Sequence, residues 1–109
     1  MIVSGYKTMW ILVLFDLPTK TKKERRDYTT FRKRLIKDGF NMIQFSVYVR
    51  SCPSLENVNV HTNRVKSFLP PEGQVRVLTF TDHQFGKQKI FCGKKRKPTE
   101  KSPAQLEFF

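Results

Sequence analysis

A continuous apolar run near the N-terminus, Trp10-Ile11-Leu12-Val13-Leu14-Phe15, limits the fold of this chain more than any other feature. The run is rich in β-branched and aromatic residues, which predicts a strand that is buried on both faces. Leu17-Pro18 then ends strand pairing and turns the chain. Asp16 is therefore expected at the point where a buried strand emerges.

The segment after this strand is strongly basic. Nine Lys or Arg lie between Lys20 and Lys37, against two acids, Glu24 and Asp27. The whole chain carries 21 Lys and Arg against 9 Asp and Glu, a formal net charge of +12. This balance favours a nucleic-acid partner, while a basic surface for anionic membranes or ribosomal RNA is the alternative.

Composition also excludes several classes of protein. Cys52 and Cys92 are too few for a disulfide framework, which favours reduced thiols in a cytoplasmic protein. The apolar run is too short to span a bilayer, so no membrane association is expected. His61 and His83 lack a Ser or Cys partner at a diagnostic spacing, and no zinc-ligand pattern exists, so both are interpreted as surface or packing residues.

The first predicted helix has signals at both ends. Thr21 and Glu24 match a capping box, and Gly39 supplies the left-handed residue that commonly closes a helix. An apolar stripe recurs at spacings of three and four: Tyr28, Phe31 and Leu35. The opposite face is cationic, with Lys22, Arg26, Lys33 and Lys37, and acids that would pair with these side chains are scarce.

Residues 40–50 alternate in hydrophobicity, but the alternation changes phase. We expect one bent strand, or two short strands that meet at a bulge near Ile43-Gln44, because no tight-hairpin signal is present there. Ser54 then caps a second helix that ends at Pro70-Pro71. The remaining predicted elements are a strand over 74–81, a turn or single helical turn over 81–86, and a short final strand over 87–92.

Four segments are predicted along the chain: an N-terminal extension (1–8), one domain (9–93), a basic flexible linker (94–103) and a strand-like C-terminal segment (104–109). The last segment suits addition to the edge of another sheet, with Leu106, Phe108 and Phe109 as partner-binding residues. A frayed tail is the alternative.

The order of the elements predicts an α+β fold. A ferredoxin-like βαββαβ sandwich, with two helices on one face of an antiparallel sheet and an extra C-terminal strand, satisfies it. The other face of such a sheet would be bare, so we expect a homodimer through the sheet face.

Asp16 admits two interpretations. Its carboxylate, at a strand end beside a cationic helix, suits a hard cation such as Mg²⁺ that meets a phosphate backbone, and a symmetric dimer would bring two copies together. Asp16 would otherwise cap the following turn or helix.

Three motifs carry a resemblance to a known family. They are Asp16-Leu17-Pro18-Thr19, then Arg25-Arg26-Asp27-Tyr28 with Phe31-Arg32-Lys33-Arg34-Leu35, and Gly39-Phe40 with Gln44-Phe45-Ser46-Val47-Tyr48. Together they resemble the CRISPR-associated protein 2 family, in particular members from systems with a single large effector nuclease. The similarity covers roughly residues 9–92.

The resemblance implies a ferredoxin-like homodimer that acts in CRISPR adaptation, where it bridges dimers of the integrase subunit, CRISPR-associated protein 1, and supports duplex DNA. It also implies a metal-dependent endonuclease of RNA or DNA, with Asp16 as the catalytic residue that binds Mg²⁺ or Mn²⁺. The duplex-binding residues expected from the basic segment are Lys20, Lys22, Lys23, Arg25, Arg26, Lys33 and Lys37. Whether the chain is an integration subunit or a stand-alone, toxin-like endoribonuclease of the same fold stays open at this point.

Overall fold

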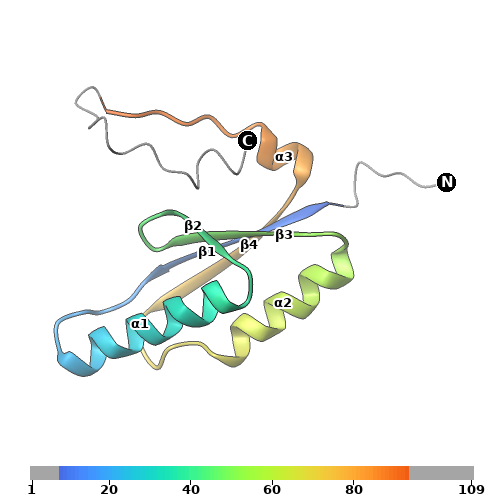
Figure 1. The fold of residues 1–109 in the computed structure, drawn as a ribbon. Coiled ribbons are helices and arrows are strands. Elements are labelled where there is room, and N and C mark those ends of the chain that lie inside the picture. Colours follow the sequence, from blue (N-terminus) through green and yellow to red (C-terminus); the bar gives the residue numbers. More distant parts are fainter. Residues whose placement is uncertain (1–7, 94–109) are drawn as a thin grey trace.

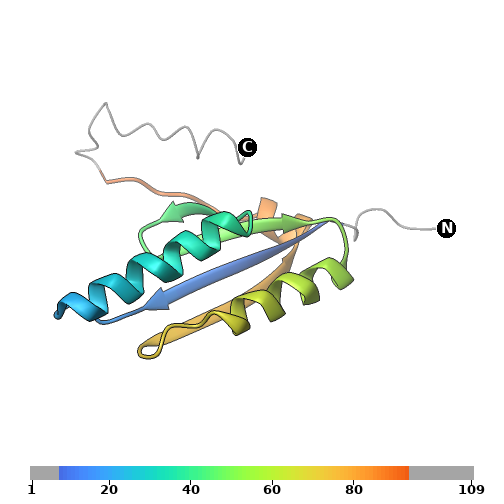
Figure 2. The ribbon, with the colours of Figure 1, turned by 60° about the horizontal axis from the view of Figure 1, so that its bottom comes forward.

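A computed structural model describes residues 8–93, and the remaining residues, 1–7 and 94–109, lie outside the described part. The elements follow the order β1 (Met9–Asp16), α1 (Lys22–Lys37), β2 (Asn41–Gln44), β3 (Val47–Cys52), α2 (Leu55–Ser67), β4 (Gln74–Thr81) and α3 (Asp82–Gly86). The strands form one antiparallel sheet in the order β2-β3-β1-β4. α1 and α2 lie side by side on one face of it (Figures 1 and 2). The predicted ferredoxin-like α+β sandwich is confirmed.

The core lies between the sheet and these two helices. Ile11, Val13 and Phe15 of β1 are buried and pack with residues of both helices, including Phe31 and Leu35. The intervening residues of β1 are only half-buried, so the prediction of a strand buried on both faces was wrong for the described chain. The physical reason is that both long helices cover the same face of the sheet.

The ends of the long helices follow the predicted signals. The Thr21 side chain accepts a hydrogen bond from the Glu24 backbone N–H at 3.0 Å, and the Glu24 carboxylate accepts the Thr21 N–H at 2.9 Å. After α1, Gly39 takes a left-handed φ of +90°, as expected of a helix-closing glycine. Ser54 caps α2 by accepting from the Asn57 N–H at 3.0 Å.

Residues 41–52 form a hairpin of two short strands, so the alternative of a single bent strand was wrong. A register shift lies between Met42 and Gln44, which agrees with the expected bulge, but the chain reverses later, at Phe45-Ser46. Ser46 has a φ of +63°, a left-handed conformation that rarely occurs without glycine. Two contacts hold it there: the Phe15 N–H donates to the Ser46 carbonyl at 3.1 Å, and the Tyr28 and Ser46 hydroxyls lie 3.0 Å apart.

The chain beyond β4 turns over the open face of the sheet. α3 carries Phe85, which stacks on Trp10 with ring centroids 4.1 Å apart, and Trp10 Nε1 donates to Asp82 at 2.7 Å. The short final strand predicted over 87–92 is absent: residues 88–93 have no regular secondary structure. No described strand pairs with this segment, so its backbone lacks the inter-strand hydrogen bonds that define a β-strand. No described helix is long and apolar enough to cross a membrane.

Candidate functional site

Asp16 lies at the end of β1, in register with the first residue of β4, Gln74. The β2–β3 turn reaches the same end of the sheet. Together these segments surround a hollow of about 250 Å³, lined by Leu14, Phe15, Asp16, Phe45, Ser46, Val47, Gln74 and Arg76. The predicted metal ligand thus occupies a concave place on the surface.

The carboxylate of Asp16 does not cap the helix that follows. Thr21 is the N-cap of α1, and within residues 8–93 no hydrogen bond or ion pair engages the Asp16 side chain. Asp16 is also exposed to solvent. Its oxygens therefore remain available to a ligand, which favours the metal-binding interpretation over the cap.

A glycine in the loop between α2 and β4 fixes the backbone at Asp16. Gly73 has a φ of +98°, and a Cβ atom placed on it would lie 2.7 Å from the Asp16 carbonyl oxygen and 2.6 Å from Leu17 Cδ2. Only glycine permits this close approach without a shift of the strand end. Our sequence analysis missed the role of Gly73, although its place after Pro70-Pro71-Glu72 marks a turn.

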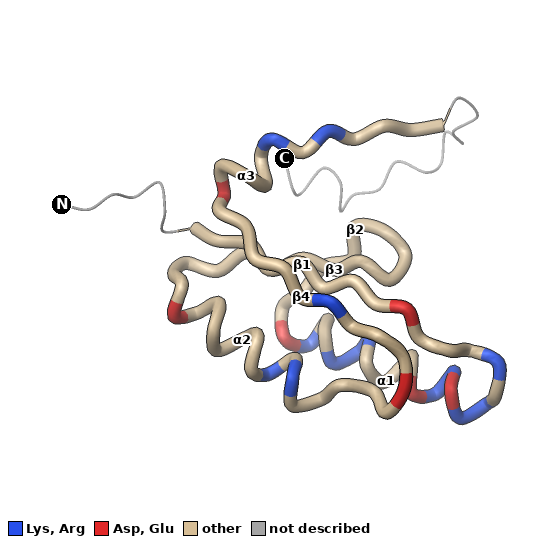
Figure 3. Tube along the Cα trace, turned by 180° about the vertical axis from the view of Figure 1, so that it is seen from behind, with Lys and Arg blue, Asp and Glu red and all other residues tan. Residues whose placement is uncertain are grey.

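The basic residues predicted to bind nucleic acid lie along α1 and the loop before it, where Figure 3 shows several Lys and Arg positions in blue. All of the predicted residues are exposed. Two of them have partners within the chain. Lys23 pairs with Asp27 at 2.9 Å, and Arg25 donates to the carbonyls of Thr19 and Lys20 at 3.3 and 2.8 Å. The other five make no ion pair in the described part of the chain: Lys20, Lys22, Arg26, Lys33 and Lys37. This unpaired charge makes the outer face of α1 the strongest candidate for phosphate contacts.

Two further cations line a shallow hollow of about 530 Å³ between α1 and α2. Arg34 lies over the Phe68 ring at 5.8 Å from its centroid, and Arg64 pairs with Asp38 at 2.9 Å. Both are exposed, so the basic surface extends from α1 onto α2. Arg34 belongs to α1 and Arg64 to α2, and only the packing of the two helices brings them together.

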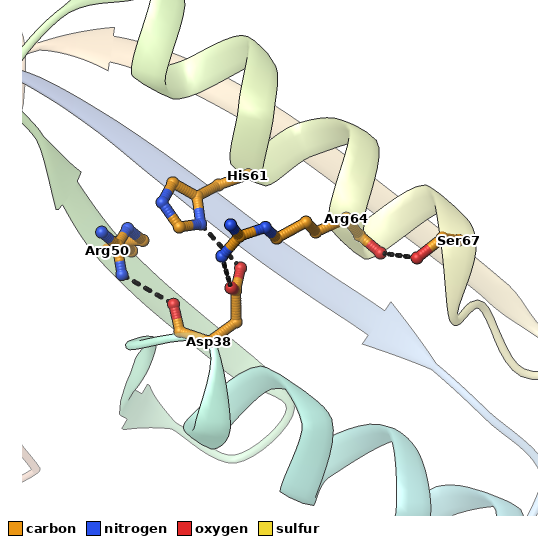
Figure 4. Close-up of polar contacts among 5 residues, drawn as sticks. All are labelled: Asp38, Arg50, His61, Arg64 and Ser67. Carbon is orange, nitrogen blue, oxygen red and sulfur yellow. Dashed lines mark hydrogen bonds and ion pairs between the residues drawn. The ribbon is translucent and has the colours of Figure 1, made fainter.

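A polar cluster, in which the Asp38 and His61 side chains are largely buried and Arg64 is exposed, connects the end of α1 to α2 and β3 (Figure 4). The Asp38 side chain is 9% exposed and accepts from His61 Nδ1 at 2.8 Å and from Arg64 at 2.9 Å. Arg50 donates to the Asp38 carbonyl at 2.6 Å. Burial by itself would raise the pKa of Asp38, but the hydrogen bonds from His61 and Arg64 outweigh it and lower that pKa. His61 is accordingly a packing residue, as the sequence predicted, and His83 is exposed on α3.

The face of the sheet opposite α1 and α2 carries a groove. Its volume is about 520 Å³, and it lies between the half-buried side of β1 and the segment after α3. Its apolar lining includes Leu12 and Leu14 of β1, Val47 of β3, and Ile90 and Phe91 of the segment after α3. Phe91 is 86% exposed, which is unusual for an aromatic residue beside an apolar surface.

The family model of the CRISPR associated protein Cas2 matches residues 9–88. The chain belongs to this family. The resemblance seen in the sequence motifs is thereby confirmed for the Cas2 domain, and the element order of the structure agrees with it.

Named relatives cover almost the whole chain. A CRISPR-associated endoribonuclease Cas2 of Parvibaculum lavamentivorans is 54% identical over 101 residues, which is 93% of this chain and 100% of the relative. A protein of the same name from Flavobacterium psychrophilum is 52% identical over 107 residues, covering 98% of this chain and 93% of the relative. A crystal structure of Cas2 matches with a TM-score of 0.54 at 18% identity, over 83% of this chain and 94% of that one, and supports the fold.

The remaining predicted site residues of the Cas2 chain fall outside the described part. Leu106, Phe108 and Phe109 belong to residues 94–109, as does the basic linker. Among the residues that the structure does describe, no group of three or more His, Cys, Asp and Glu side chains surrounds a potential metal position. A cation at Asp16 would depend on one carboxylate per chain, supplemented by water or by a second copy.

Proposed function

We propose that this chain is a CRISPR adaptation subunit that forms a homodimer, binds the backbone of duplex DNA and bridges dimers of the integrase subunit, CRISPR-associated protein 1. Family membership supports the CRISPR role. The observation that carries DNA binding is the exposed cationic face of α1, on which Lys22, Arg26, Lys33 and Lys37 have no acidic partner in the described chain. Repulsion among such charges is relieved when a polyanion binds.

Duplex binding through these residues should not depend on base sequence. Lys and Arg contact phosphates, which fix position along the helix but carry no sequence information. If a dimer neutralises about eight phosphates, the logarithm of the binding constant should fall against the logarithm of salt with a slope of roughly −7. Titration of a labelled duplex at several salt concentrations tests this, and binding that is indifferent to salt would contradict it.

The homodimer is supported by the groove on the open face of the sheet. Leu12 and Leu14 are half-buried there, and the exposed Phe91 lies beside them. A second copy packed on this face would cover the apolar side chains. Sedimentation equilibrium at micromolar protein should show a dimer, and a species of only 12.9 kDa would contradict the proposal.

We infer a second, enzymatic activity: metal-dependent endonuclease chemistry at Asp16. The relatives are named as endoribonucleases. An exposed carboxylate without a hydrogen-bond partner in residues 8–93 fits Mg²⁺ or Mn²⁺, which are bound through one or two carboxylates and several waters. When bound, the cation would supply Lewis-acid chemistry at a phosphate.

Asp16→Ala should abolish hydrolysis and leave duplex binding in place, because Lys and Arg side chains, and not the Asp16 carboxylate, contact the phosphates of a duplex. Glu72→Ala is a matched control, since Glu72 is an exposed acid that lies near β4 but outside the hollow at Asp16. Hydrolysis of RNA and DNA oligonucleotides with Mg²⁺, and again with EDTA, gives the readout. Activity that survives Asp16→Ala or EDTA would show that the catalytic site lies elsewhere.

The integrase subunit is proposed as the partner of the C-terminal segment, through Leu106, Phe108 and Phe109. A strand added to a sheet edge gains affinity from main-chain hydrogen bonds and specificity from side-chain pockets. Deletion of residues 98–109 should leave folding and duplex binding unchanged but weaken assembly with the integrase subunit or the dimer itself. Unaltered assembly and dimerisation would identify these residues as a frayed tail.

A further inference from the structure

The hollow between α1 and α2 brings together three cations from two helices. Arg34 and Lys37 lie in the last turn of α1, and Arg64 lies in the last turn of α2. All three are exposed. Among the described residues that line the hollow, the one acid is Asp38, whose side chain is 9% exposed and already accepts from His61 and Arg64. The hollow therefore carries an excess of positive charge that no described acid neutralises.

The attraction of cations to helix C-termini does not explain this arrangement. Lys and Arg are favoured in the last turn of a helix because the macrodipole is negative there. Lys66 lies in the same last turn of α2 as Arg64, but it does not line the hollow. The dipole thus accounts for cations on both helix ends, whereas the packing of the two helices places Arg64 in one hollow with Arg34.

Both guanidinium groups in the hollow are held in place and still reach solvent. Arg64 Nη1 donates to the Asp38 carboxylate at 2.9 Å, and the Arg64 side chain is 58% exposed. Figure 4 shows this guanidinium reaching from α2 to the Asp38 side chain at the end of α1. Arg34 lies over the Phe68 ring, 5.8 Å from its centroid, and makes no ion pair within residues 8–93. A guanidinium carries several N–H donors in a planar fork that fits phosphate oxygens, so each can bind an anion and keep its present contact.

We propose that this hollow holds a phosphate group of the duplex backbone between Arg34 and Arg64. The inference rests on the duplex binding proposed above and adds a contact site on α2. Lys37 joins the two surfaces, because it lines the hollow and also lies one turn after Lys33 on the cationic face of α1. The described lining comes entirely from α1, α2 and their C-caps, so the hollow lies on the helical side of the sheet (Figure 2). A homodimer through the opposite face would leave it accessible.

Two features favour a backbone phosphate over a free anion or an unpaired base. The hollow is shallow, whereas sites for small molecules bury most of their ligand. A phosphate within a polymer is also held by the contacts of neighbouring phosphates, which the outer face of α1 would supply. The Phe68 ring already contacts Arg34 and Phe31, so it is not a free platform for stacking a base. We therefore expect contacts to the backbone alone, without preference for base sequence.

The test is the anisotropy of a labelled duplex of arbitrary sequence, measured in EDTA at several salt concentrations. Arg34→Gln should weaken binding roughly 10-fold and reduce the salt slope by about 1 for each hollow that contacts the duplex. Arg34→Lys should keep the slope but not the full affinity, because the planar fork is lost. Arg64→Gln should show the same loss as Arg34→Gln. Since Arg64→Gln also removes an ion pair with Asp38, Arg34→Gln, which leaves that pair in place, is the deciding variant.

Lys66→Gln is the matched control, since it removes one charge from α2 outside the hollow. It should change duplex affinity by less than about 2-fold, because salt screens exposed charges that are distant from the phosphates. Equal losses in Arg34→Gln and Lys66→Gln would show that only total charge matters and would overturn the proposal. Unchanged duplex affinity in Arg34→Gln would overturn it as well.

Two further measurements separate this proposal from its neighbours. If inorganic phosphate at constant ionic strength raises the melting temperature of wild type but not of Arg34→Gln, while both bind the duplex equally, the hollow holds a free anion and the proposal is wrong. A combined Lys22→Gln and Arg26→Gln variant tests the outer face of α1 separately. If that variant weakens duplex binding and Arg34→Gln does not, duplex binding through α1 stands and the hollow has no part in it. If neither weakens it, both proposals are wrong.

Discussion

The buried carboxylate of Asp38 allows the attachment of α1 to α2 to be measured directly. Asp38→Asn keeps the size of the side chain but turns an NH₂ group toward one of two donors, His61 Nδ1 at 2.8 Å or Arg64 at 2.9 Å. A hydrogen bond to a charged group contributes about 1.5–3 kcal/mol, and an unsatisfied buried donor costs a similar amount. Arg64 is 58% exposed, so its ion pair adds no more than about 1 kcal/mol. We expect the free energy of unfolding to fall by about 2–3 kcal/mol.

Asp27→Asn is the matched control on the same helix. Asp27 pairs with Lys23, whose side chain is 72% exposed, so its loss should cost only about 0.5 kcal/mol. Urea unfolding at pH 7 and one fixed protein concentration measures both, and Asp38→Asn should lower the midpoint by roughly 1–2 M. If the two variants lose equal stability, the Asp38 cluster does not hold the helices together and the reasoning fails.

Three other predictions follow from the described geometry. Folding lowers the pKa of Asp38, so the ionised carboxylate stabilises the folded protein above the unfolded pKa near 3.8, and this stabilisation is lost as the pH falls toward the folded pKa. In acid unfolding, the difference in unfolding free energy between wild type and Asp38→Asn should therefore narrow below about pH 4. Thr21→Ala should cost about 1 kcal/mol through loss of the α1 cap, whereas Thr30→Ala, in the exposed middle of the helix, should cost far less in the same urea assay. Gly73→Ala should shift the Asp16 backbone and lower both thermal stability and metal-dependent hydrolysis, and a variant with unchanged melting and activity would show that the close approach is unimportant.

Local signals predicted most of the fold. The caps at Thr21 and Ser54 and the strand over 74–81 are found where sequence places them, because each depends on residues within a few positions. The hairpin was missed because Ser46 takes its left-handed φ from contacts with α1 and β1, which no local pattern encodes. The final strand was overpredicted because apolar alternation cannot reveal whether a neighbouring strand is available.

The candidate site was predictable only in part. Asp16 was predicted from sequence because the apolar run before it and Leu17-Pro18 after it mark the end of a strand. Arg76 and Phe45 come to the same hollow as Asp16 through sheet register and a tertiary turn, so their position beside Asp16 could be seen only in the structure. The Asp38 cluster joins residues 23 and 26 positions apart, and helical periodicity relates positions only within one helix.

The position of β1 at the centre of the sheet has a consequence for synthesis of the chain. β1 is made first, but its partner β4 spans residues 74–81, near the end of the domain. Until β4 has been synthesised and has left the ribosome, the edge of β1 that pairs with it is unpaired and can pair with another chain. Pairing across such a sequence separation is also slow to form. Nascent chains that pause before residue 74 therefore leave the β4-facing edge of β1 unpaired for a longer time, and this edge is prone to aggregation.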